Sequence, residues 1–70
     1  MTKFEYCTFI QERETRKNII MFSDENIQIS SGETMLSIIN GLGKEEWELV
    51  TSDLNEKIAV YWLKRELNIN

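Results

Sequence analysis

Alternating apolar and polar positions predict strands in the first part of this chain. From Lys3 to Gln11 every second side chain falls on the same side, which is the period of a β-strand. Glu12 to Asn18 is polar throughout and predicts a solvated hairpin loop, and the apolar run Ile19 to Phe22 predicts a second strand. Ile27 to Ile29 alternates only briefly, so a short third strand and an extended connector fit it equally well.

The period changes after Ser30 from that of a strand to that of a helix. Four apolar residues at the spacing i, i+3, i+4 and i+7 predict one stripe of an amphipathic helix at about residues 31–43, with Leu36 at its margin; they are Met35, Ile38, Ile39 and Leu42. Ser30 and Glu33 have the spacing of an N-terminal capping box. Gly43 predicts a left-handed residue that ends the helix.

The C-terminal part predicts a hairpin whose second strand is apolar on both faces. The strands are Trp47 to Ser52 and Lys57 to Leu67, joined by a loop at Asp53 to Glu56. One helix covers only one face of a small sheet, so the other face is expected to meet a second subunit, another sheet or a ligand. The residues expected at this interface are Phe9, Ala59, Tyr61 and Leu63. Packing in the core or at the interface is the simplest role for both tryptophans, Trp47 and Trp62.

These elements predict a single α+β domain over residues 1–70, a small antiparallel sheet with one amphipathic helix in the order ββαββ. A core of this size stabilises a fold only marginally without reinforcement. The chain has one cysteine, Cys7, and no histidine, which excludes an internal disulfide and a Cys/His zinc site. Oligomerisation remains as the reinforcement, most simply as a two-fold homodimer.

Charge and hydropathy limit the partners. A net charge of −4 and a pI of about 4.7 disfavour duplex nucleic acid as a partner. No apolar run approaches the ~18 residues of a membrane span, and the opening MTKFEYCTF lacks the apolar segment of a secretory signal. We therefore expect a cytoplasmic protein that does not contact a membrane.

Two segments resemble a family signature. NGLGKEEWELV from Asn40 and YWLKREL from Tyr61 are similar to the LNxLGxxGWELV and YxLKR motifs of the domain of unknown function 4177 family, small bacterial and phage proteins. The opening FEY is similar to that family's usual WEY or YEY. The resemblance spans nearly the full chain, weakly in Glu12 to Ser31, and implies a ββαββ domain without implying an activity. Glu46 stands where the family has glycine before the tryptophan, and Ile39 replaces its usual leucine.

Catalytic chemistry has little support in the sequence. Without histidine, a Ser/His or Cys/His nucleophile is impossible, and Cys7 in the middle of a strand is expected to be an inert, packed thiol. Adjacent acids, as at Asp24 and Glu25, usually form solvated faces, so neither a metal nor a catalytic site is predicted. We expect no enzymatic activity and no cofactor.

Two binding functions remain. The first is an accessory or regulatory protein that dimerises through its sheet and binds a protein partner. The second is a phage-type anti-defence protein that sequesters a small nucleotide-like anion at the dimer seam. The candidate ligand-binding residues are Arg13, Arg16, Lys17, Tyr61 and Arg65. A solvated polar loop is the alternative for the first three, because Glu12 and Glu14 neutralise part of their charge.

Overall fold

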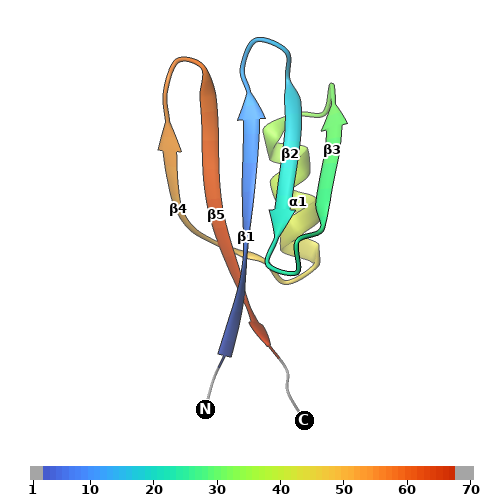
Figure 1. The fold of residues 1–70 in the computed structure, drawn as a ribbon, viewed down its shortest axis with the longest axis vertical. Coiled ribbons are helices and arrows are strands. Elements are labelled where there is room, and N and C mark those ends of the chain that lie inside the picture. Colours follow the sequence, from blue (N-terminus) through green and yellow to red (C-terminus); the bar gives the residue numbers. More distant parts are fainter. Residues whose placement is uncertain (1–2, 68–70) are drawn as a thin grey trace.

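The protein is a five-stranded antiparallel sheet with one helix packed across one face (Figure 1). The computed structural model describes residues 3–67. In chain order the elements are β1 (Lys3–Glu12), β2 (Lys17–Phe22), β3 (Ile27–Ser31), α1 (Met35–Lys44), β4 (Glu48–Leu54) and β5 (Ile58–Leu67). The strands lie side by side as β3-β2-β1-β5-β4, so the N-terminal and C-terminal strands are neighbours near the middle of the sheet.

The α+β class is confirmed, but the predicted ββαββ order is wrong because a third strand precedes the helix. Ile27 and Ile29 of β3 pair with Met21 and Ile19 of β2. A tight turn makes this pairing possible, since Glu25 adopts a left-handed φ of 69° and the Asp24 carboxylate accepts the backbone N–H of Asn26 at 3.1 Å. The segment is therefore an edge strand and not a connector.

The helix carries the predicted apolar stripe but begins later than predicted. Thr34 is the N-cap, and its hydroxyl oxygen accepts the backbone N–H of Ser37 at 3.1 Å. The predicted capping box is wrong: Ser30 belongs to β3, and its hydroxyl donates to the Glu33 carboxylate at 2.9 Å. Because β3 extends to Ser31, the helix begins only after a short connection.

The helix ends in a Schellman motif that places Glu46 in the left-handed region. The backbone N–H of Trp47 donates to the Leu42 carbonyl and that of Glu46 to the Gly43 carbonyl, both at 3.0 Å. Glu46 has φ 71°, whereas Gly43 lies within the helix and is not the left-handed stop that the sequence predicted. The motif brings Trp47 and Leu42 together in the core.

The core lies between the helix and one face of the sheet. Its buried members are Cys7, Phe9, Ile20, Leu42, Trp47, Ala59, Tyr61 and Leu63, and Phe22, Ile38 and Ile39 pack against it. Phe9 and Tyr61, on adjacent strands, stack with ring centroids 5.6 Å apart. The Tyr61 hydroxyl contacts the sulfur of Met35 at the start of α1. This layer fixes the helix over the sheet.

Asn18 is buried although the sequence placed it in a solvated loop. It belongs to β2 and is 1% exposed. Its side-chain oxygen accepts from the Gln11 carboxamide at 2.8 Å, and its side-chain nitrogen donates to the Glu33 carbonyl at 3.3 Å. A buried amide without partners would cost about 1–3 kcal/mol. These bonds tie the β1–β2 hairpin to the segment that leads into the helix.

Arg65 of β5 joins the helix end to the sheet. Its guanidinium pairs with Glu5, its partner in register on β1, and donates to the Glu45 carbonyl at 3.0 Å. It also lies 4.5 Å from the centre of the Trp47 ring, within cation–π range. The Arg65 side chain therefore connects β1, the C-terminal end of α1 and Trp47.

The outer strand β4 contains a β-bulge. Leu49 pairs with Leu63 and Thr51 with Trp62, so Val50 is an extra residue without an opposite partner on β5. The bulge resets the alternation, which places Leu49 on the helix side of the sheet and Thr51 on the opposite side.

We expect the Glu46→Gly variant to be more stable than the natural chain by about 1 kcal/mol. Glycine adopts positive φ without strain, whereas the Cβ of Glu46 clashes with the backbone in this conformation. Urea denaturation measures the difference. Glu45→Gly is the matched control, since it removes the same charge from a neighbouring residue with φ −92° and should not stabilise. Equal effects of both variants would show that charge, and not backbone conformation, is responsible.

Candidate functional site

The face of the sheet that points away from the helix is apolar across four strands. Residues opposite one another in an antiparallel sheet share a face, so the register defines two rows that cross all five strands. The first row, from β3 to β4, is Ile29, Ile19, Ile10, Val60 and Asp53; the second is Ile27, Met21, Thr8, Trp62 and Thr51. We call these two rows the open face. Only on β4 are both residues of the open face, Asp53 and Thr51, polar.

Large apolar side chains of the open face are exposed to solvent. Ile27 and Ile29 are 59% and 62% exposed, and Trp62 and Met21 are 39% and 37% exposed. The helix covers the opposite side of the sheet, as the location of the core shows (Figure 1). A contiguous apolar surface of this kind usually marks an interaction site.

The sequence predicted that the helix leaves one face of the sheet uncovered in a single copy, and the structure has such a face. However, the sequence prediction assigned the uncovered face to the wrong set of residues. Phe9, Ala59, Tyr61 and Leu63 were expected at the interface, and each is at most 6% exposed beneath the helix. The uncovered residues of β5 are instead the alternate ones, Val60 and Trp62. The helix packs on the side that carries the Phe9–Tyr61 stack.

The five predicted ligand-binding residues do not form one site within a single copy. Arg13 and Arg16 line a pocket of about 300 Å³ beside the start of α1, together with Gln11, Glu33, Thr34 and Met35. Lys17 is exposed at the start of β2. Tyr61 is buried, and Arg65 is held by Glu5 and the helix C-terminus. Only the two loop arginines are brought together.

The backbone of the arginine loop is anchored at both ends. The N–H of Arg13 donates to the Lys57 carbonyl at 3.0 Å, and the N–H of Arg16 donates to the Glu12 carbonyl at 2.9 Å. Arg16 has φ 56°, a left-handed turn conformation. The loop therefore holds the two arginine backbones in a defined position near the helix.

Cys7 is a core residue, 2% exposed, on the helix side of β1. Burial raises the pKa of its thiol to about 11; Arg65 opposes this shift and Glu5 adds to it. Such a thiol is almost entirely protonated at neutral pH, and the thiolate is the reactive form. Residues 3–67 contain neither a group of three or more acidic, cysteine or histidine side chains able to hold a metal ion nor a helix long and apolar enough to cross a membrane.

Comparison with known proteins gives no match to a family, to a curated protein or to a solved structure. The resemblance to the domain of unknown function 4177 family therefore stays a prediction.

We expect Cys7 in the folded protein to react with a soluble disulfide reagent at pH 8 at least ~100-fold more slowly than in urea, because a pKa raised from 9.0 to about 11 lowers the thiolate fraction by about that factor. Stopped-flow absorbance measures both rates. Similar rates in the folded and the unfolded protein would contradict the buried position.

Proposed function

We propose that this chain is a small dimeric binding protein whose two copies pack together through the open face. The observation that carries the proposal is the pair of apolar rows from β3 to β5 with exposed Ile27, Ile29 and Trp62. A two-fold dimer needs only one self-complementary surface on each copy, and the open face supplies it. The helix side remains free to bind a partner.

The size of the molecule supports a second copy as the occupant. Within residues 3–67 the core contains eight buried apolar residues, which is little for a fold whose single cysteine excludes an internal disulfide.

A binding function also agrees with the chemistry of the chain. It has no histidine, and its single thiol is buried with a raised pKa. We therefore assign the protein an accessory or regulatory role, with binding and not catalysis as its mode of action.

We expect the natural chain to be dimeric at micromolar concentration and the Trp62→Glu variant to be monomeric, because a carboxylate in the apolar interface would lose its hydration. Size-exclusion chromatography with light scattering measures the mass. Trp62 pairs with Thr8 and Thr51, so glutamate meets no acidic residue directly opposite.

Leu36→Glu is the matched control. Leu36 is 65% exposed on the helix, away from the open face, and this variant should remain dimeric. A monomeric natural chain, or equal dissociation of both variants, would contradict dimerisation through the open face.

A second candidate function is the sequestration of a small nucleotide-like anion, supported by the convergence of Arg13 and Arg16 on one pocket beside the helix N-terminus. Tyr61 and Arg65 take no part in this narrower site. Glu33 also lines the pocket and reduces its positive charge, so we favour the first proposal.

A thermal-shift screen with cyclic nucleotides tests the second candidate. At a hundred times its dissociation constant a ligand should stabilise the fold by about 2.7 kcal/mol. This shift should disappear in Arg13→Ala and Arg16→Ala and persist in Lys44→Ala, which removes a cation from the other end of the helix. No shift with any nucleotide would eliminate these ligands.

A further inference from the structure

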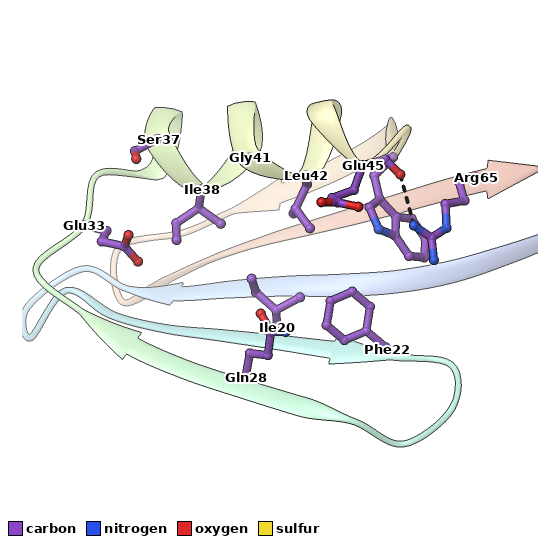
Figure 2. A pocket seen from close by; sticks show the side chains of 11 residues that line it. Ile20, Phe22, Gln28, Glu33, Ser37, Ile38, Gly41, Leu42, Glu45 and Arg65 are labelled. Carbon is purple, nitrogen blue, oxygen red and sulfur yellow. Dashed lines mark hydrogen bonds between the residues drawn. The ribbon is translucent and has the colours of Figure 1, made fainter.

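A pocket with an apolar floor lies between α1 and the strands β2 and β3, on the side of the sheet opposite the open face. Its volume is about 470 Å³, within the range of small-molecule sites. Figure 2 shows Ile38 and Leu42 pointing from the helix toward Ile20 and Phe22. Ile20 and Leu42 belong to the core, and Phe22 and Ile38 pack against it, so the floor is formed by packed side chains.

Polar groups surround this floor, and two of its three charged residues are acidic. The carboxylates of Glu33 and Glu45 line the pocket with the neutral side chains of Gln28 and Ser37. The one cationic residue in the lining is Arg65, whose charge is met by Glu5 and whose guanidinium lies over Trp47. The pocket therefore presents apolar surface and two carboxylates to a ligand, although Glu33 also lines the neighbouring pocket of Arg13 and Arg16.

Gly41 lines the mouth of the pocket, and the fold itself gives no reason for a glycine there. It is the seventh residue of the ten-residue helix, where glycine is destabilising relative to alanine. Its φ is not positive, and a Cβ added to it would meet no atom within 4 Å. Because Gly41 has no side chain, the space above the pocket floor is open.

We propose that this pocket binds a small organic cation, an amine with an aromatic or branched apolar body. The body would lie on Ile20, Phe22 and Ile38, and the ammonium group would face the carboxylate at one end of the pocket, that of Glu33 before the helix or that of Glu45 after it. Charge complementarity selects this class over anions, and the absent side chain of Gly41 leaves room for its entry. The site is separate from the open face, so the proposal holds whether or not the chain dimerises.

The test uses Trp47 as the reporter, because this tryptophan lines the pocket. The Trp62→Phe variant leaves Trp47 as the single tryptophan and keeps the open face apolar. Three probes of similar shape are titrated while its fluorescence is recorded: 2-phenylethylamine, neutral 2-phenylethanol and anionic 3-phenylpropionate. We expect a saturable change with the amine and an affinity at least ~3-fold weaker for the other two, the scale of one exposed ion pair.

Two sets of variants in this Trp62→Phe background locate the binding. Gly41→Leu fills the mouth and should abolish binding of the amine, whereas Gly43→Leu makes the same change outside the pocket lining and should leave it intact. The double variant Glu33→Gln, Glu45→Gln should weaken the amine and leave the alcohol unchanged. It tests the charge assignment separately from any effect of Gly41→Leu on folding, which circular dichroism monitors.

Three outcomes would overturn the proposal. The first is the absence of a saturable signal with the amine. The second is full binding to a folded Gly41→Leu variant. The third is binding of 3-phenylpropionate as tight as that of the amine. Each leaves the dimerisation result untouched, because that result is read from molecular mass.

Discussion

One helix of ten residues, about 15 Å long, has to cover a sheet of five strands. It covers one face, and the buried Phe9–Tyr61 stack beneath it is the centre of the core. Cys7 and Trp47 become buried for the same reason, and Val60 and Trp62 remain on the uncovered side. Both proposed binding surfaces follow from this imbalance, one at the helix margin and one on the uncovered face.

The strands were largely predictable from the sequence because alternation is a local signal. β1 and β5 begin and end within one residue of their predicted limits. Local patterns do not determine which face the helix chooses, since Phe9 and Ile10, or Tyr61 and Trp62, are apolar neighbours on opposite faces. That choice depends on contacts between the helix stripe and residues distant in sequence. The face assignment was therefore reversed although its premise was sound.

Turns and caps were harder to predict because tertiary pairing overrides their local signals. Ser30 and Glu33 have the spacing of a capping box, yet Ser30 lies in β3. Its side chain forms a hydrogen bond with that of Glu33 outside the helix. Asn18 is polar and still buried, since Gln11 and Glu33 satisfy its amide. The pocket beside the helix combines side chains from four elements and two connections, and no spacing pattern in the sequence predicts that these come together. A glycine inside a strongly patterned helix, at Gly41, was the one signal available in the sequence.

The bulge at Val50 has a consequence for the way copies of this chain associate. A straight edge strand is a template to which another chain can add by backbone pairing, and repeated addition produces filaments. The bulge interrupts the regular spacing of hydrogen-bonding groups along β4 and increases its twist. Pairing of another chain along this edge is thereby disfavoured. The extra residue thus makes β4 a poor template for an open-ended polymer.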